Sequence, residues 1–512
     1  LHLLTTLLVF GFTREILTIL SDDKALSTRA SLLAAMVFGV HPVLSEAVNS
    51  VFNGSEIYVT LGAVGGLWYL LRNHAEHPVR SWLVLGLIYF VALLFRESAV
   101  SIPLLAVIAI WFTSRERWMV RVRQCLPVLL LTIPLTIYMG MRSEALEGPA
   151  QLAGGAGPEN IQLRSEIQTE ANQVTSEQNS EARVPVKAAA PDMKVKPGEK
   201  TSRNILDEYG LSFGPKRVSL AGSMWFDALR LMVWPHPLTV FREVTSTNFW
   251  LALAAQSLLL TFAFFAALRG RPGFIAGLAL FYAAILPSSR IISESFLPPL
   301  LLDRMLYLPS LGLVICLACG LTWLMARFPQ KFILSGTTVA LLALVSLTWA
   351  RNDAWSDEVK LLEGDFRKVP DHAQLLYSLV RTNMRSGNPQ RSMELCRKRP
   401  DLARQAGYII MECGNAFATG RKYDSAETYY LQAIQKDPSL AWAHFHLARM
   451  LLHMGRSSDA QEHFETAVNK EKKPFVREYM TAVMLIELYP NDPQRLARAR
   501  THLENALRLQ PR

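Results

Sequence analysis

Two glutamates stand at the boundary between two apolar stretches, where a carboxylate could act as a base or as a metal ligand. Glu46 lies in the segment from His41 to Val48, which ends one apolar stretch, and Glu56 begins the next. A carboxylate held there could accept a proton from a hydroxyl group or bind a divalent metal ion. The alternative, that both are ordinary polar residues at helix ends, stays open.

Two arginines with acidic neighbours are candidates for binding a phosphate group. Arg96 and Glu97 interrupt the apolar stretch 81–112, and Asp303 and Arg304 directly precede another. A guanidinium group offers paired donors that match phosphate oxygens, and ionised groups within a membrane are costly unless they are paired or functional. A hairpin ion pair at Arg96 and interface anchoring at Arg304 would explain the same residues without chemistry.

Apolar stretches supply the elements that must position these residues. A helix needs about 20 residues to cross the ~30 Å hydrocarbon core of a bilayer, so several of the stretches predict short spans. As one helix, 81–112 would be about 50 Å long, and we therefore expect two spans that meet at Arg96. The stretches are 1–20, 28–44, 57–71, 81–95, 98–112, 125–141, 249–268, 273–286, 305–326 and 332–350.

Positive charge alternates between the loops in a way that predicts an orientation. If Lys24 and Arg29 are cytoplasmic, every short basic loop falls on that side, as the positive-inside bias requires. These loops carry Arg72, Arg80, Arg115, Arg117, Arg121, Arg123, Arg269, Arg271, Arg327 and Lys331. The segments that hold the candidate glutamates and arginines, together with the whole C-terminus, then fall on the opposite side.

The distribution of charged residues and cysteines argues against a nucleic-acid-binding protein and shows no disulfide or zinc framework. The formal net charge is +10, but much of the positive excess lies in short loops between apolar stretches, so we expect no nucleic-acid partner. Of the five cysteines, only Cys396 and Cys413 lie in polar sequence. No disulfide or zinc framework is readable from this pattern.

The polar interval between the two groups of stretches has two parts. Residues 143–205 are poor in aromatic residues and cannot bury enough apolar surface to offset the entropy of ordering, which predicts a disordered outer loop. Within 206–248, apolar and charged residues alternate around a helix from Val218 to Trp234, which Pro235 ends. This pattern predicts an interfacial amphipathic helix.

The C-terminal part shows a period of 34 residues. Small and large apolar residues recur at the positions that define the tetratricopeptide repeat, a pair of helices that packs on its neighbours. In the repeat that begins at Gly407 these residues are Gly414, Phe417, Ala426, Tyr430, Ala433 and Pro438. A degenerate first unit around Leu379 and Cys396 is expected to cap the array. Such solenoids mostly bind peptides or partner proteins.

These segments together resemble a known family. His41 to Val48, the Arg96 and Glu97 pair, Trp234 to Leu238, Asp303 to Ser310, and Arg351 to Glu358 occur in the same order, before the repeats, as in the transmembrane and tetratricopeptide-repeat protein O-mannosyltransferases. The resemblance covers nearly the whole chain. It implies an all-α fold, with a polytopic transmembrane bundle of the GT-C glycosyltransferase type followed by an α-solenoid.

The resemblance also implies an activity. Such enzymes transfer a sugar, typically mannose, from a polyprenyl-phosphate donor to Ser or Thr hydroxyls of proteins on the periplasmic or lumenal side. By this resemblance Glu46 and Glu56 would be catalytic, with a possible divalent metal. The substrate-binding residues would be His41, Arg96, Glu97, Asp303 and Arg304.

The chain departs from the family pattern at several positions. Family members carry an acidic pair in the first outer loop, ahead of a helix similar to 1–20, and the sequence begins after that loop, so we expect the first-loop catalytic acid to be missing. Gly54 and Ser55 precede Glu56 where the family usually has Gly-Arg, and Arg96 stands where Lys is common.

Two functions therefore remain. The first is an integral-membrane glycosyltransferase, in a bacterial inner membrane or the endoplasmic reticulum, with its repeats presenting acceptor proteins. The alternative is a non-catalytic membrane-anchored repeat scaffold. The expected division is 1–142 for the first spans, 143–205 for the loop, 206–248 for the amphipathic segment, 249–350 for the remaining spans, 351–370 for a linker and 371–512 for the repeats.

Overall fold

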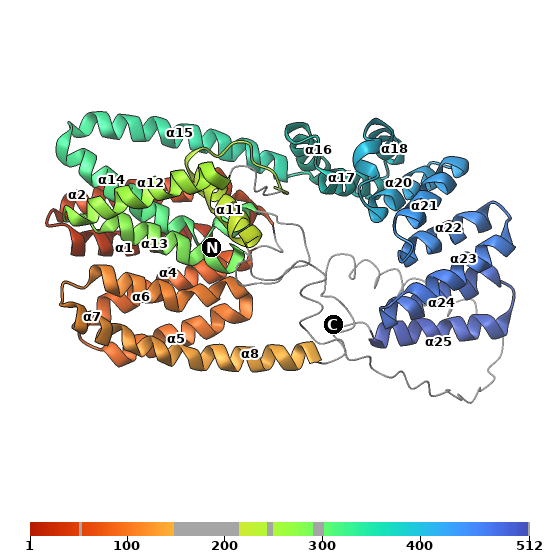
Figure 1. Ribbon diagram of the computed structural model, residues 1–512, viewed down its shortest axis with the longest axis horizontal. Coiled ribbons are helices and arrows are strands. Elements are labelled where there is room, and N and C mark those ends of the chain that lie inside the picture. The colour runs from red at the N-terminus through yellow and green to blue at the C-terminus, as the bar shows by residue number, and fades with distance from the viewer. Residues whose placement is uncertain (51–53, 148–214, 243–248, 290–301, 510–512) are drawn as a thin grey trace. The chain divides into compact units, whose positions relative to one another are not determined.

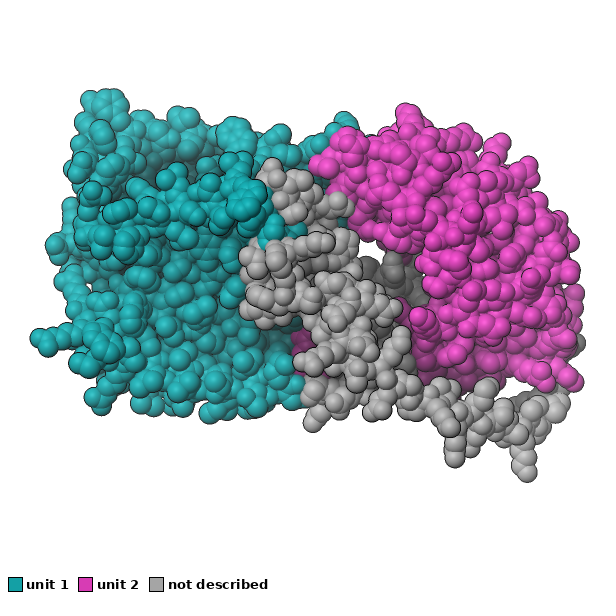
Figure 2. Space-filling model, viewed as in Figure 1, with its two compact units in different colours: residues 1–140, 199–368 teal, residues 141–198, 369–512 magenta. Residues whose placement is uncertain are grey.

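The computed structural model describes residues 1–50, 54–147, 215–242, 249–289 and 302–509, and the regular elements among them are all helical. The chain divides into two compact units (Figures 1 and 2). The first contains the described residues of 1–140 and 199–368, and the second contains the described residues of 141–198 and 369–512, the latter being the repeats. The expected loop 143–205 lies almost entirely outside the described residues.

Each predicted apolar stretch coincides with helical structure in the first unit. Six of the described helices are long and apolar enough to cross a membrane, or seven if a bent pair counts as one span. The helices that cover the apolar stretches, the shorter ones included, are α1 His2–Leu20, α2 Lys24–Gly39, α4 Ser55–Asn73, α5 Pro78–Phe95, α6 Ile102–Thr113, α7 Trp118–Cys125, α8 Thr132–Glu147, α12 Phe249–Leu268, α13 Gly273–Ile285, α14 Ser310–Arg327 and α15 Gln330–Trp355.

Two breaks in these helices place the candidate residues. The stretch 28–44 is not one straight helix, because the chain bends by 48° between α2 and the short helices that follow it, η1 Pro42–Leu44 and α3 Ser45–Asn49. Proline cannot continue the hydrogen-bond ladder and restricts the residue before it. The predicted break near Arg96 is confirmed, since α5 ends at Phe95 and Arg96 has an extended backbone before η3, Glu97–Ser101.

Close backbone contact joins the two helices on either side of Arg304's segment. A Cβ atom added to Gly277 of α13 would lie 2.6 Å from the carbonyl oxygen of Gly312 in α14. Only glycine permits this approach. The contact fixes α14 against α13 and thereby positions η8, Asp303–Leu306, which directly precedes α14.

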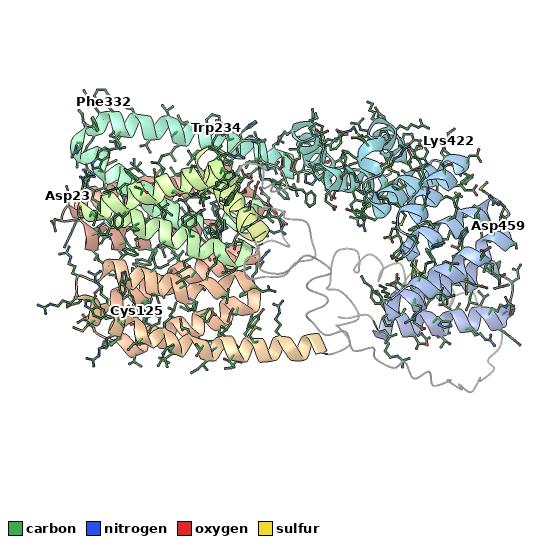
Figure 3. All side chains as sticks on the ribbon, viewed as in Figure 1. Asp23, Cys125, Trp234, Phe332, Lys422 and Asp459 are labelled. Atoms are coloured by element: carbon green, nitrogen blue, oxygen red, sulfur yellow. A yellow bond between two sulfur atoms is a disulfide. The ribbon has the colours of Figure 1, made fainter. Side chains whose placement is uncertain are left out.

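The basic loops gather at one end of the bundle. Arg29 donates a hydrogen bond to Gln330 over 2.8 Å, and Arg115 donates to the carbonyl of Ile19 over 2.7 Å. Arg271 and Arg327 lie over the ring of Trp323. Figure 3 shows Asp23 and Phe332 toward this end of the first unit and Trp234 toward the other. The alternation of helix direction assumed for the positive-inside argument therefore agrees with the fold.

The predicted amphipathic helix is present as α11, Pro215–Val233, but its apolar face packs on the bundle. Met224, Ala228 and Leu231 are buried in a cluster that includes Val43 and Leu306. An amphipathic pattern indicates that one face of a helix is covered, but it does not distinguish a membrane surface from other helices of the protein. At the helix end, Val233 and Trp234 are largely exposed.

The expected linker 351–370 is mostly helical and belongs to the first unit. α15 continues to Trp355, and α16, Glu358–Lys368, follows after a short turn. The repeats therefore begin after Lys368.

The second unit consists of consecutive helix pairs with the predicted period, which confirms the all-α class and the solenoid. The side chain of Tyr430 fills the space beside Gly414, where an added Cβ would lie 2.7 Å from the ring. Gly387, Arg421 and Gly455, spaced 34 residues apart, have positive φ in the turn within each pair. The helices are α17 Ala373–Arg385, α18 Pro389–Lys398, α19 Pro400–Ala403, α20 Gly407–Thr419, α21 Tyr423–Lys436, α22 Ala441–His453, α23 Ser457–Lys470, α24 Pro474–Leu488 and α25 Pro493–Leu509.

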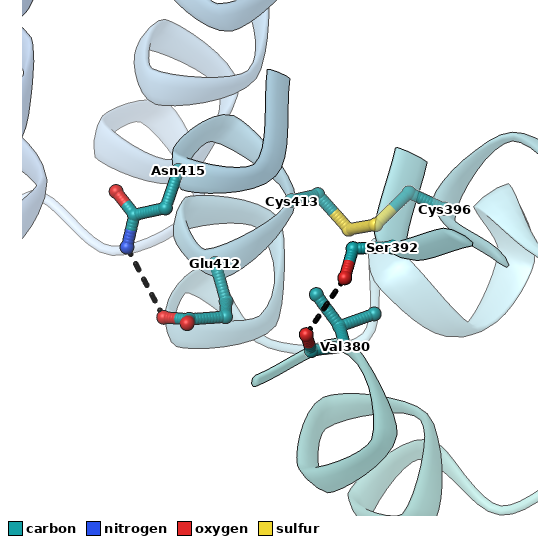
Figure 4. The surroundings of a disulfide bond; sticks show 6 residues. All are labelled: Val380, Ser392, Cys396, Glu412, Cys413 and Asn415. Carbon is teal, nitrogen blue, oxygen red and sulfur yellow. Dashed lines mark hydrogen bonds between the residues drawn. A yellow bond between two sulfur atoms is a disulfide. The ribbon is translucent and has the colours of Figure 1, made fainter. Parts of the chain in front are cut away.

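A disulfide joins the first two repeat units and corrects the sequence analysis, which reads no disulfide framework. Cys396 of α18 and Cys413 of α20 are both buried and bonded, with Cα atoms 5.9 Å apart (Figure 4). Their pairing depends on the packing of α18 against α20, which spacing along the chain does not show.

We expect the double variant Cys396→Ser with Cys413→Ser to lower the free energy of unfolding of the repeats by about 3 kcal/mol, because a closed loop of this length restricts the unfolded chain by roughly that amount. Chemical unfolding of the second unit, followed by circular dichroism, measures the change. Dithiothreitol should destabilise the parental chain equally and leave the double variant unchanged. Equal stability of the oxidised and reduced parental chain would contradict this prediction.

Candidate functional site at one end of the bundle

Glu46 and Arg304, which are 258 residues apart in sequence, form an ion pair at the end of the bundle opposite the basic loops. One Glu46 oxygen accepts from the Arg304 guanidinium over 2.7 Å, and the other accepts from the Arg304 backbone N–H over 3.1 Å. Glu46 is buried and Arg304 is partly exposed. The bend at Pro42 and the segment η8 bring the two residues together. Both residues are candidates in the sequence analysis, but their contact is not predicted there.

Glu56 forms a second pair close to the first. Its carboxylate lies 2.9 Å from the Arg96 Nε atom and accepts a hydrogen bond of 2.9 Å from the Ser98 hydroxyl. Arg96 also donates to the hydroxyl of Ser55 over 3.1 Å. The charges of Arg304 and Glu46 act on Glu56 as well. Four of the predicted site residues therefore belong to one local network.

Asp303 lies beside this network and is fully enclosed. Its Oδ1 atom has no hydrogen-bond partner among the described residues. Burial, reinforced by the Glu46 carboxylate, raises the pKa of Asp303 to about 7, while Arg242 and Arg351 act in the opposite direction. At neutral pH this carboxyl group is therefore partly protonated and could donate a hydrogen bond.

A further buried ion pair involves residues to which the sequence analysis gave no role. Arg351 of α15 donates two hydrogen bonds, of 2.8 and 3.3 Å, to Asp365 of α16. Asp365 also accepts from the backbone N–H of Val240 over 2.8 Å and from Lys368 over 3.0 Å. An arginine at the end of an apolar stretch is a usable signal in sequence, but Asp365 lies in the segment that was expected to be a linker.

The remaining predicted residues have other surroundings. His41 contacts backbone groups with both ring nitrogens, Nε2 at 3.1 Å from the carbonyl of Met232 and Nδ1 accepting from the N–H of Val43 over 3.4 Å. It thus ties α11 to the bend after α2. Glu97 is exposed at the start of η3.

The ion pairs of Glu46 and Glu56 determine which reactions these carboxylates can take part in. Glu46 and Glu56 each accept bonds from an arginine, so neither is a free base in this state. An anion that drew Arg304 or Arg96 away would release a carboxylate, which is the step that transfer to a hydroxyl would need. Within the described residues, no group of three or more His, Cys, Asp or Glu side chains is arranged to hold a metal ion.

Comparison with known protein families supports the assignment of tetratricopeptide repeats to the second unit. The family model described as tetratricopeptide repeat matches residues 429–462, which run from α21 through α22 into α23. The chain matches no curated protein. From the family match and its helix pairs, the chain is a helical protein that contains tetratricopeptide repeats.

Several solved structures are similar to part or most of the chain. The crystal structure of MamA is 18% identical over 32% of this chain and 90% of its own, with a TM-score of 0.25. A second MamA structure, from AMB-1, is 20% identical over 31% and 92%, with a TM-score of 0.24. The Cut9–Hcn1 hetero-tetramer of APC/C is 10% identical over 95% and 85%, with a TM-score of 0.22. The comparisons thus give no support to the resemblance to O-mannosyltransferases.

Proposed function

We propose that this protein is a membrane-anchored scaffold whose tetratricopeptide repeats bind segments of other proteins. The observation that carries the proposal is the presence, in one chain, of six or seven helices suited to cross a membrane and a separate array that matches the tetratricopeptide repeat. Repeats of this kind stack into extended binding surfaces. The bundle would hold that surface at the membrane.

Exposed apolar side chains support the membrane anchor. α12 exposes Trp250, Leu258 and Leu268, and α15 exposes Phe332 and Trp349, each by more than 60%. Of the 26 residues in α15, Arg351 alone is buried. Long helices that expose large apolar side chains are suited to a lipid environment and would otherwise favour aggregation.

Removing residues 369–512 should separate the two roles. The remaining chain is expected to stay in the membrane fraction after a carbonate wash at high pH, because its helices satisfy their own backbone hydrogen bonds. Proteins that chemical cross-linking captures on the full chain should be lost. Retention of the same cross-linked proteins, or release of the shortened chain from the membrane, would overturn the proposal.

We further propose that the repeats lie on the non-cytoplasmic side, periplasmic or lumenal. Two observations support this side. The basic loops gather at the end of the bundle opposite the one from which α15 leads into the repeats, and the repeats carry a disulfide, a bond that persists mainly in oxidising compartments.

Labelling of single introduced cysteines in intact cells tests this orientation. Gln461→Cys in the repeats should react with a membrane-impermeant maleimide, and Gln178→Cys in the polar interval should react equally. Glu116→Cys, in a basic loop, should react only after the membrane is permeabilised. Protection of Gln461→Cys in intact cells would place the repeats in the cytoplasm.

A glycosyltransferase is a second candidate, favoured by one observation. Glu46 with Arg304 and Glu56 with Arg96 converge from four segments at one end of the bundle. Arginines that can exchange a carboxylate for a phosphate group suit a polyprenyl-phosphate sugar donor, and the released carboxylate suits a hydroxyl acceptor. The existing ion pairs also explain these residues as purely structural.

A further inference from the structure

The second unit contains a recess among its helices. It has a volume of about 220 Å³ and lies among α19, α20 and α21. Ile410 of α20 and the ring of Tyr429 form apolar parts of its lining. The polar lining comes from Arg404, Ser425, Thr428 and Gln432.

Two arginines lie beside this recess, Arg404 in its lining and Arg397 near its aromatic wall. Among the described residues, neither Arg404 nor Arg397 forms an ion pair, whereas Arg391, Lys398 and Arg399 nearby are all paired with carboxylates. An arginine that borders a recess without a carboxylate partner is available to an acidic ligand.

Arg397 and Arg404 both lie near the aromatic pair of Phe417 and Tyr429. The Arg397 guanidinium lies 5.1 Å from the centre of the Phe417 ring, which stacks on Tyr429 at 4.9 Å. Arg404 lines the recess directly, and its charge and that of Arg397 act on the Tyr429 hydroxyl. Burial raises the pKa of Tyr429, so this hydroxyl stays neutral and adds no negative charge to the site.

The remaining polar groups suit a carboxylate. The Ser425 hydroxyl and the Gln432 amide can donate hydrogen bonds, whereas the Thr428 hydroxyl already donates to the carbonyl of Asp424 over 2.9 Å. The ring of Tyr429 and Ile410 can cover the methylene groups that carry a carboxylate. A free inorganic anion would use the cation and leave this apolar wall without a contact.

The disulfide ties α20, one of the helices that line the recess, to α18. Cys396 and Cys413 join α18 to α20, and α19 lies between these two helices in sequence. A site that is already ordered loses less entropy on binding.

We propose that this recess binds an aspartate or glutamate side chain within an extended segment of a partner protein. The proposal rests on the scaffold function and names the chemistry of its partner. Charge complementarity carries it, through Arg404 in the lining and Arg397 close by. The apolar wall favours a side chain over a free anion.

Binding of short peptides to the full chain in detergent tests this site. The probe is a fluorescein-labelled peptide, Ser-Gly-Glu-Glu-Leu-Gly-Ser, compared with its Gln-Gln counterpart by fluorescence anisotropy at low salt. The parental chain should bind the Glu-Glu peptide at least ten-fold more tightly. Arg404→Ala should weaken that binding by about ten-fold, since charge-assisted hydrogen bonds contribute at this level.

Two controls keep the result specific. Arg477→Ala removes the same charge from an exposed position on α24 and should bind the peptide as the parental chain does, and the melting temperature of each variant reports folding. Equal affinity of the parental chain for the two peptides, or parental affinity in Arg404→Ala, would overturn the proposal. Either result would leave the proteins cross-linked to the repeats unchanged, so the scaffold function would stand.

Discussion

Asp365→Ala is expected to lower the free energy of unfolding of the first unit by about 3–5 kcal/mol, the usual result of removing one partner from a buried ion pair. Asp365 is fully buried and accepts hydrogen bonds from Arg351, Lys368 and the backbone of Val240. The substitution would leave the buried Arg351 guanidinium without the carboxylate that pairs with it directly. Unfolding in mixed detergent micelles, followed by tryptophan fluorescence, measures the loss.

Asp353→Ala is the matched control for this prediction. Asp353 pairs with Lys360 over 2.7 Å, and both side chains are more than half exposed. Exposed ion pairs contribute little, and we expect a change below about 0.5 kcal/mol. If Asp365→Ala were as mild as Asp353→Ala, the pairing of α15 with α16 would not hold the end of the bundle together.

Glu46→Gln and Glu56→Gln should each reduce sugar transfer by about 10²- to 10⁴-fold if the chain is a glycosyltransferase, which is the usual effect of losing a general base. The assay would follow a labelled sugar from a polyprenyl-phosphate donor to a Ser-containing peptide. Under the scaffold function no transfer is expected from the parental chain.

The contact between Glu46 and Arg304 complicates this test. Glu46→Gln leaves the guanidinium without its counter-charge, so lost transfer could reflect lost stability. The double variant Glu46→Gln with Arg304→Gln removes both charges and should recover most of the stability. Transfer should remain absent in this double variant if either Glu46 or Arg304 takes part in the reaction. Folded variants that retain parental transfer would assign both glutamates a structural role.

The sequence predicts the elements of this protein better than their contacts. Apolar stretches such as 249–268 match helices because a run of that composition and length has few other stable forms. The tetratricopeptide pattern also predicts which positions are small, as the contact of Gly414 with Tyr430 shows. Both signals are local in the chain.

The pairings at the end of the bundle could not be predicted in this way. Glu46 meets Arg304 only because the bend at Pro42 and the segment η8 come together in three dimensions. The role of Asp365 could not be predicted because polar sequence after an apolar stretch resembles a linker. Only the structure shows that α16 packs on α15. The Cys396–Cys413 bond likewise depends on how α18 lies against α20.

The proposed function is that the bundle anchors the chain in the membrane and the repeats bind partner proteins. It is tested most directly by joining residues 369–512 to one unrelated membrane span of the same orientation, and comparing cross-linked partner proteins by quantitative mass spectrometry. Since the repeats form their own compact unit and chiefly contact one another, we predict that the fusion captures the same proteins as the full chain. Loss of those proteins from a fusion whose repeats remain folded would show that the bundle does more than anchor.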